Sequence, residues 1–294
     1  MRLATRAALP AALGLLLAAS FAAAQKPAPA AQPTVVFAVE EAPGLATHWI
    51  EPIATLENGD FKPVPVSCDD ENAAAANAFF ARYLAKGRTY PLLYGGKQVG
   101  SVMPSGQVDA GGTPGSFAEL RLQPGERSPI GAIATNLPSL ARRQGRRREP
   151  TAAERQWTTE VAKEVLREHR VADKDLARLH DDGIAAADLE GRGEFTLIAT
   201  FVIPTPDGLG IQDSLFFAVK PAPGAEPSLL WYDHPASVSA GEELLYVDQL
   251  PLRLGEPDDL LVHVAFYENS SYRIYRFHII NWRPVFEGPI YGCF

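Results

Sequence analysis

The sequence predicts a mainly β protein of the α+β class, with antiparallel sheets in two β-rich halves joined by a helical connector. Short apolar runs recur throughout the chain, separated by turns rich in Gly, Pro and Asn. Helical periodicity is concentrated in two places, residues 71–86 and 151–181. From residue 184 onward strand follows strand without an intervening helix, which is typical of antiparallel sheets and not of βαβ units.

Residues 1–24 have the pattern of a secretory signal peptide. Arg2 and Arg6 form a positive start, Leu9 to Ala19 an apolar run, and Ala22 to Ala24 a small-residue cleavage site. Residues 25–33 (QKPAPAAQP) read as a disordered Pro/Ala linker. We therefore expect an exported protein, periplasmic or secreted, without a membrane-spanning helix.

The charge of the chain argues against nucleic acid as a partner. The formal net charge is −8, and removal of Arg2 and Arg6 with the signal peptide makes it −10. Proteins that bind phosphate backbones present positive faces instead. The expected partner is an unknown protein or glycan of the envelope or the extracellular space.

The chain has two cysteines, Cys68 and Cys293. An even count in an oxidising compartment predicts a disulfide between them. Two separate thiols are the alternative.

Residues 34–140 are expected to form an N-terminal β domain with one helix. Thr34 to Val39 reads as a strand, and Asn58-Gly59 as a type I′ turn between two more. Pro52, Pro63 and Pro65 suggest that these are edge strands. A helix over 71–86 ends at Gly87, and further strands are expected at 90–94, 98–103, 117–122 and 130–135.

Residues 141–183 are expected to form the helical connector. Five arginines crowd its start (Arg142, Arg143, Arg146, Arg147 and Arg148), and they predict either an anion-binding patch or a solvated junction. Thr151 and Glu154 form a capping box. The helix that follows carries Trp157, Val161 and Val165 on its apolar side, with Ala162 and Leu166 alongside, and a shorter helix is expected over 173–181.

Residues 184–294 are expected to form the C-terminal β domain. Eight strands are predicted, in two sets of four, at 184–189, 194–203, 211–220, 228–233, 243–250, 259–267, 272–280 and 282–287. Each set begins near a loop of Gly and acidic residues. The first loop is Asp188-Leu-Glu-Gly-Arg-Gly-Glu-Phe-Thr-Leu-Ile-Ala, and the second is a degenerate copy between Val247 and Val262.

These two loops resemble the calcium loops of FG-GAP repeats, the blades of integrin-alpha-type propellers. The resemblance covers about residues 184–287 and implies two propeller-type blades in an exported bacterial protein. In the family, carboxylates at loop positions one, three, five and nine bind calcium. Here Asp188 and Glu190 keep positions one and three, whereas Arg192 takes position five and Thr196 position nine.

The second copy is further from the family pattern. It has Pro251, Arg253, Gly255 and Asp259 at the four positions, with Asp258 beside them. We expect Arg192 to pair with Asp188 or Glu190, and Arg253 with Asp258 or Asp259, in place of a metal. The expectation is therefore no cofactor, with calcium as the alternative.

The sequence contains no pattern that carries catalysis. The six histidines lack zinc spacing, and Asp233-His234 with Ser237 and Ser239 lacks the surroundings of a catalytic triad. Aromatic residues are dense in the last strands, where Tyr267, Tyr272, Tyr275 and Trp282 form either a partner surface or a strand covered on both faces. We expect a non-enzymatic binding or structural module, with a secreted hydrolase acting on envelope or extracellular polymers as the alternative.

Overall fold

The computed structural model describes residues 33–42, 47–66, 70–106, 108–110, 113–137, 139–140, 146–221, 228–234, 242–253, 255–266, 269–279 and 281–290. Residues 33–294 form one compact unit. The protein is mainly β, and all of its strand pairs are antiparallel among the described residues. Cys68, Cys293 and Tyr267 lie outside the described residues, so the disulfide stays a prediction.

Six strands of the N-terminal part close into a barrel in the order β2-β1-β8-β4-β5-β7, with β7 pairing back onto β2. The short strands β3 and β6 extend the sheet beyond β2 and β7. The strands run over β1 (Thr34–Glu41), β2 (His48–Glu57), β3 (Asp60–Pro63), β4 (Tyr90–Tyr94), β5 (Lys97–Pro104), β6 (Val108–Ala110), β7 (Thr113–Leu122) and β8 (Gly131–Thr135).

Helix α1 (Asp70–Tyr83) covers the barrel core. It contributes Phe80 and Tyr83, which pack with Phe37, Ile50 and other inward-facing barrel residues. Asn58 and Gly59 have φ of 53° and 90°, as a type I′ turn requires. The expectation that Pro52 marks an edge strand is wrong, because β2 pairs on both sides and Pro52 is accommodated at a register shift opposite Phe37.

The connector contains β9 (Arg147–Arg148), α2 (Ala152–Glu168) and α3 (Asp173–Leu176). The predicted capping box is confirmed, since Thr151 accepts from the Glu154 amide and the Glu154 side chain accepts from the Thr151 amide. Of the predicted apolar side of α2, Ala162, Val165 and Leu166 are buried, whereas Trp157 and Val161 are only half-buried and Thr158 is buried beside them. Glu154, at the start of this face, is also buried and is paired with Arg148.

All eight strands predicted after residue 183 are present, and they divide into two sets of four as expected, although the connector strand β9 adds a fifth strand to the first sheet. They run over β10 (His180–Ala187), β11 (Thr196–Pro204), β12 (Ile211–Lys220), β13 (Ser228–Asp233), β14 (Glu243–Leu250), β15 (Asp259–Ala265), β16 (Ser270–His278) and β17 (Asn281–Glu287). The first sheet has the order β13-β12-β11-β10-β9, and the second β14-β15-β16-β17. Each set of four is a simple up-and-down meander.

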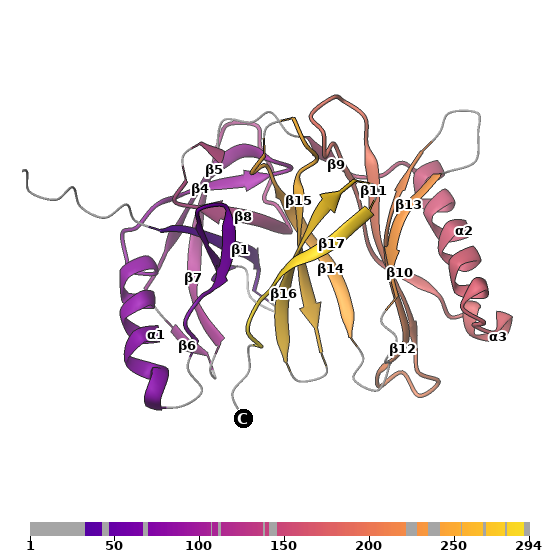
Figure 1. The fold of residues 1–294 in the computed structure, drawn as a ribbon, viewed down its shortest axis with the longest axis horizontal. Helices are drawn as coiled ribbons and strands as arrows, with labels where there is room; N and C mark the ends of the chain where they lie inside the picture. The colour runs from indigo at the N-terminus through magenta and orange to yellow at the C-terminus, as the bar shows by residue number, and fades with distance from the viewer. Residues whose placement is uncertain are drawn as a thin grey trace, which may run out of the picture. The chain divides into compact units, whose positions relative to one another are not determined.

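The two sheets and the barrel are packed in successive layers (Figure 1). One face of β14–β17 packs on the outside of the barrel, where Leu261 and Ile274 meet Val36 and Ile133. The opposite face packs on β10–β13, where Leu260 and Val262 meet Phe216. Helix α2 covers the remaining face of β10–β13. Because both faces of the middle sheet are covered, its strands are apolar on both sides.

Candidate functional site

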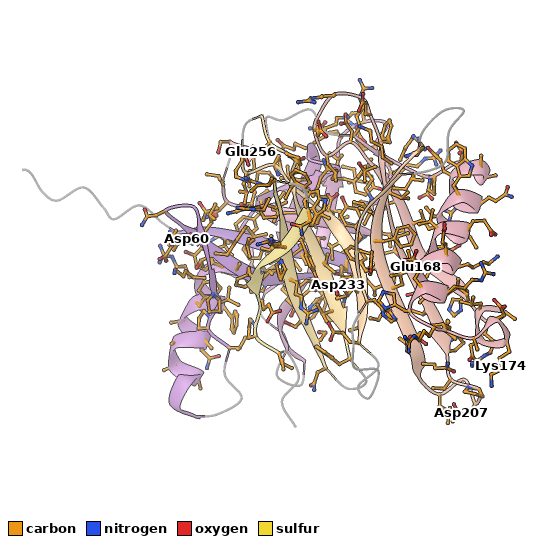
Figure 2. The ribbon with its side chains drawn as sticks, turned by 45° about the vertical axis from the view of Figure 1, so that its right-hand side comes forward. Asp60, Glu168, Lys174, Asp207, Asp233 and Glu256 are labelled. Carbon is orange, nitrogen blue, oxygen red and sulfur yellow. The ribbon has the colours of Figure 1, made fainter. Side chains whose placement is uncertain are left out.

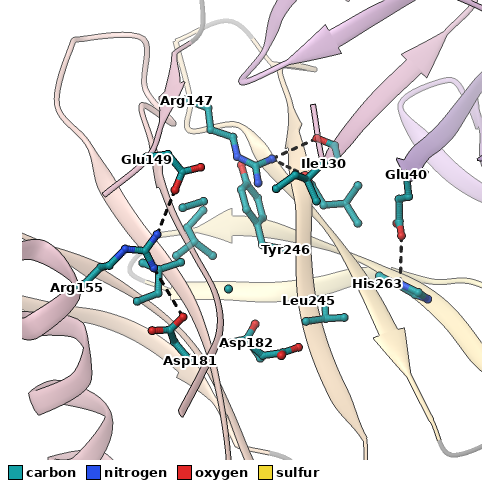
Figure 3. A pocket seen from close by; sticks show the side chains of 17 residues that line it. Glu40, Ile130, Arg147, Glu149, Arg155, Asp181, Asp182, Leu245, Tyr246 and His263 are labelled. Carbon is teal, nitrogen blue, oxygen red and sulfur yellow. Dashed lines mark hydrogen bonds and ion pairs between the residues drawn. The ribbon is translucent and has the colours of Figure 1, made fainter. Parts of the chain in front are cut away.

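A cavity of about 480 Å³ lies where the barrel, β10 and the strands β14 and β15 meet (Figure 3). Strand β8 contacts β14 at this junction. The lining comprises charged groups, an aromatic ring and an apolar floor, namely Glu40, Ile130, Gly131, Arg147, Glu149, Arg155, Asp181, Asp182, Gly183, Ile184, Ala185, Ile198, Thr200, Leu245, Tyr246, Val247 and His263. This size falls within the range of small-molecule binding sites.

Arg147 joins three of these structural parts at the top of the cavity. Its guanidinium lies 4.8 Å from the ring centres of both Tyr94 in the barrel and Tyr246 on β14. It also donates to the Val247 carbonyl at 2.6 Å and lies 3.5 Å from the carboxylate of Asp248. The guanidinium of Arg147 is therefore already engaged by other groups of the protein.

Asp248 is fully buried behind Arg147. Both of its carboxylate oxygens accept from the Gly95 amide at 3.0 Å. Burial raises the pKa of Asp248 to about 7, against the opposing charge of Arg147. Gly95 has φ of 60°, and a Cβ at this position would lie 2.6 Å from the backbone nitrogen of Arg147. The close approach of the barrel to β9 therefore requires glycine at position 95.

Two of the five clustered arginines are therefore structural. Arg148 forms a bidentate pair with Glu154, at 2.8 and 2.6 Å, and lies over the Phe195 ring. The pKa of Glu154 is lowered to about 2, chiefly by the hydrogen bond from Arg148. Arg142 and Arg143 lie outside the described residues. An anion-binding patch thus has no support from Arg147 or Arg148.

One wall of the cavity combines an arginine with several acids. Arg155 lies 3.1 Å from Glu149 and 3.7 Å from Asp181, so its charge is matched by two carboxylates (Figure 3). Asp182 lies instead close enough to Glu243 to interact with that carboxyl. Burial, followed by the interaction with Asp182, raises the pKa of Glu243 to about 8.

The opposite wall contains Glu40 and His263, with Glu51 and Tyr272 behind them. The Tyr272 hydroxyl donates to Glu40 at 3.3 Å and to Glu51 at 3.2 Å. His263 stacks on the Tyr272 ring, and its Nδ1 lies 3.6 Å from Glu40. Glu51 is 5 % exposed, and its Oε1 has no hydrogen-bond partner in the described structure. Burial and then the charge of Glu40 raise the pKa of Glu51 to about 8.

The two glycine-acid loops lie side by side, away from the lining of this cavity. The Asp258 amide donates to the Leu189 carbonyl at 2.9 Å. The buried Gln249 donates both to the Asp188 carbonyl at 3.1 Å and to the Asp258 carboxylate at 2.7 Å. Gly191 and Gly193 have φ of 69° and 83°, in the left-handed region that favours glycine.

Each of the two loop arginines forms an ion pair with one of the acids expected from the sequence. Arg192 lies 2.8 Å from Glu190, and Arg253 lies 3.3 Å from Asp259 while also pairing with Glu256. Asp259 is buried and also accepts a bidentate pair from Arg276. Asp188 uses both carboxylate oxygens to accept the amides of Arg192 and Gly193, at 3.0 and 2.7 Å.

Within the described ranges no group of three His, Cys, Asp or Glu side chains has the arrangement of a metal site. The occupied carboxylate of Asp188 agrees with this. Thr196, at the ninth loop position, is buried at the start of β11. Pro251 is buried and Gly255 lies exposed in the turn before β15.

Three of the four aromatic residues singled out in the last strands belong to the core. Tyr272, Tyr275 and Trp282 are 2, 1 and 4 % exposed, so the covered alternative, and not an open partner surface, describes these three. Tyr275 donates to Asp233 at 2.8 Å. His234 pairs with Asp213 at 3.1 Å and not with its neighbour Asp233. Ser237 and Ser239 lie outside the described residues.

The sequence interpretation missed the cavity because its lining comes from positions 40 to 263 and forms no motif. A signal was nevertheless present. Glu51 and Asp248 are acids in the interior of the largely apolar strands β2 and β14, and both prove to be buried, Glu51 behind Glu40 and Asp248 behind Arg147. Buried acids with shifted pKa values occur often at functional sites.

Comparisons with family models, curated proteins and solved structures give no match to this chain. In the part of the chain that the structure describes, no helix has the length and apolar character needed to cross a membrane. The geometry of the cavity is therefore the basis for a functional assignment.

Proposed function

We propose that the protein is an exported, non-enzymatic binding module of the cell envelope or the extracellular space, and that the cavity is its ligand site. The observation that carries this proposal is the cavity itself, at a junction of three packed layers with polar walls and an apolar floor. Ligand sites occur preferentially at such junctions. Export rests on the signal-peptide pattern of residues 1–24.

We also propose that β10–β13 and β14–β17 are counterparts of two FG-GAP-type blades. Each is a four-stranded antiparallel meander, and the two meanders pack face to face. The Gly/acid loops that suggested the family lie next to one another, linked through Gln249. In this proposal β14–β17 is the second blade. The barrel covers the face of this blade on which the next blade of a propeller would pack.

Gly183 offers a way to block the cavity without disturbing the fold. It lines the cavity, its φ is not left-handed, and a Cβ placed on it meets nothing within 4 Å. Gly183→Phe therefore fills space that is empty in the wild type. Gly210→Phe is the matched control, because Gly210 lies in the turn between β11 and β12, and its Cβ would make only ordinary contacts with Thr205.

The test is saturation-transfer NMR with four probes of different charge: agmatine, glycine betaine, N-acetylglucosamine and succinate. We expect at least one probe to bind the wild type and Gly210→Phe but not Gly183→Phe. Failure of all four to bind, or equal binding to the blocked variant, would contradict the proposal. Thermal unfolding of both variants verifies that they are folded.

A second candidate function is hydrolysis of an envelope or extracellular polymer. The observation that favours it is the grouping of Glu40 and Glu51 around the Tyr272 hydroxyl, with His263 beside Glu40. A carboxyl with a pKa raised to about 8, as at Glu51, is protonated at neutral pH and suited to act as a general acid. Release of reducing ends from peptidoglycan or starch by wild type but not by Glu51→Gln would support hydrolysis over binding alone.

A further inference from the structure

The charges that line the cavity are unevenly compensated, and this indicates which ligands it accepts. Both lining arginines are already used: Arg147 by backbone carbonyls, Asp248 and two aromatic rings, and Arg155 by Glu149 and Asp181. No guanidinium is therefore left to bind an anion. An anionic ligand would have to break one of these pairs.

Two lining acids have no lysine or arginine partner in the part of the chain that the structure describes. Among the described residues neither Glu40 nor Asp182 forms an ion pair with a lysine or an arginine. Glu40 is contacted by Tyr272 and by His263, and Asp182 by Glu243. The two acids come from different walls, Glu40 from β1 and Asp182 from β10, with Leu245 on the floor between them (Figure 3).

Each of these acids has a second carboxyl directly behind it. Glu51 shares the Tyr272 hydroxyl with Glu40, is 5 % exposed, and leaves Oε1 without a partner in the described structure. Glu243 is the carboxyl that interacts with Asp182. Pairs of carboxyls with no counter-ion retain a proton, because two negative charges in one poorly solvated place repel each other. A bound cation would remove the need for that proton.

We infer that the cavity accepts a small organic cation, with amine or guanidinium groups directed at Asp182 and Glu40 and an aliphatic part on the floor. This inference rests on the proposed function of the cavity as a ligand site. The floor residues Ile198, Leu245 and Val247 suit a methylene chain, and the separation of the acids on two walls suits a ligand with a cationic group at each end. Agmatine has this chemistry and is the probe for the test.

The experiment is isothermal titration calorimetry of agmatine, succinate and N-acetylglucosamine at pH 7 and low salt. We expect agmatine to bind the wild type and succinate not to bind. Asp182→Asn should lower the affinity for agmatine at least tenfold, and Glu40→Gln should lower it by a similar factor. Asp207→Asn is the matched control, because Asp207 lies in the exposed turn between β11 and β12 (Figure 2) and should leave the affinity unchanged.

Failure of this inference can be told apart from failure of the proposed function. Binding of succinate or N-acetylglucosamine that is lost in Gly183→Phe, with no binding of agmatine, overturns the cation preference and leaves the ligand site standing. Equal affinity of agmatine for Asp182→Asn, Glu40→Gln and wild type also overturns it. If no probe binds the wild type, both proposals fail.

Discussion

Arg147 and Asp248 form a buried ion pair, with their side chains 3.5 Å apart, at the point where the barrel, β9 and β14 meet. The carboxylate reaches the barrel through the Gly95 amide, and the guanidinium reaches β14 through the Val247 carbonyl. The pair therefore links parts of the chain that are about 50 to 150 residues apart in sequence. Its burial makes it sensitive to the loss of either partner.

Asp248→Ala should lower the free energy of unfolding by about 3–5 kcal/mol, because it leaves a buried guanidinium without its counter-ion. Asp173→Ala is the matched control. Asp173 pairs with Arg167 at 3.1 Å in an exposed position, and loss of such a pair costs about 1 kcal/mol or less. Urea denaturation measures both variants. Equal losses would show that the buried pair does not stabilise the junction.

Glu51 should make stability depend on pH. Its pKa is about 8 in the folded protein and about 4.5 in the unfolded chain, so unfolding releases a proton between these values. The free energy of unfolding therefore falls as pH rises from about 4.5 to about 8, by up to about 1.4 kcal/mol per pH unit for this group.

Glu51→Gln removes this contribution. Relative to wild type, the variant should gain more stability at pH 8 than at pH 5, as measured by urea denaturation at each pH. Glu168→Gln, at the exposed end of α2 (Figure 2), is the control. This variant should change the free energy of unfolding by the same small amount at pH 5 and at pH 8. A pH-independent offset for Glu51→Gln would mean that Glu51 ionises normally in the folded state.

The strand pattern was predictable from local sequence, whereas the barrel and the cavity were not. Turn residues such as Asn58-Gly59 and the Pro- and Gly-rich connections after residue 203 fixed the strand boundaries closely. Closure of the barrel depends on pairing of β2 with β7, across more than 50 residues, and no local pattern specifies it. Pro52 misled because a register shift, invisible in sequence, accommodates it.

The site was hidden for a related reason. Arg147 stood in a run of arginines that resembled a solvated patch, and nothing in that run distinguished the one residue that becomes buried between two tyrosine rings. By contrast, the pairing of Arg192 and Arg253 with nearby acids could be anticipated, because each pair lies within one short loop.

The glycine-acid loops should not respond to calcium. Asp188 already accepts two backbone amides, and Asp259 is held by Arg253 and Arg276, so few carboxylate oxygens remain for an ion that needs six to eight. Millimolar calcium should leave the melting temperature unchanged. A calcium-dependent rise would restore the metal chemistry of the family that the loops resemble.

The same loops predict an order among three arginine variants. Arg276→Ala should destabilise the protein most, because Arg276 makes the bidentate contact to the buried Asp259. Arg253→Ala should lower the stability less, because Arg276 still contacts Asp259. Arg192→Ala should lower it least, because the pair of Arg192 with Glu190 is exposed. Melting temperatures of the three variants measure this order, and the reverse order would contradict it.

The predicted bridge between Cys68 and Cys293 can be tested directly on the purified protein. Peptide mapping without reductant should recover the two cysteines in one linked fragment. Reduction should lower the melting temperature, because a bridge closing so long a loop is worth about 4–5 kcal/mol in the chain-entropy model. Recovery of two separate thiols would refute the bridge.

The central claim is that the cavity at the junction of barrel and sheets binds a ligand. The most direct measurement is the affinity of agmatine for the wild type, for Gly183→Phe and for Gly210→Phe by calorimetry at pH 7. We expect saturable binding to the wild type and to Gly210→Phe, and at least a tenfold loss in Gly183→Phe. Binding of equal strength to all three proteins would place the ligand elsewhere and contradict the claim.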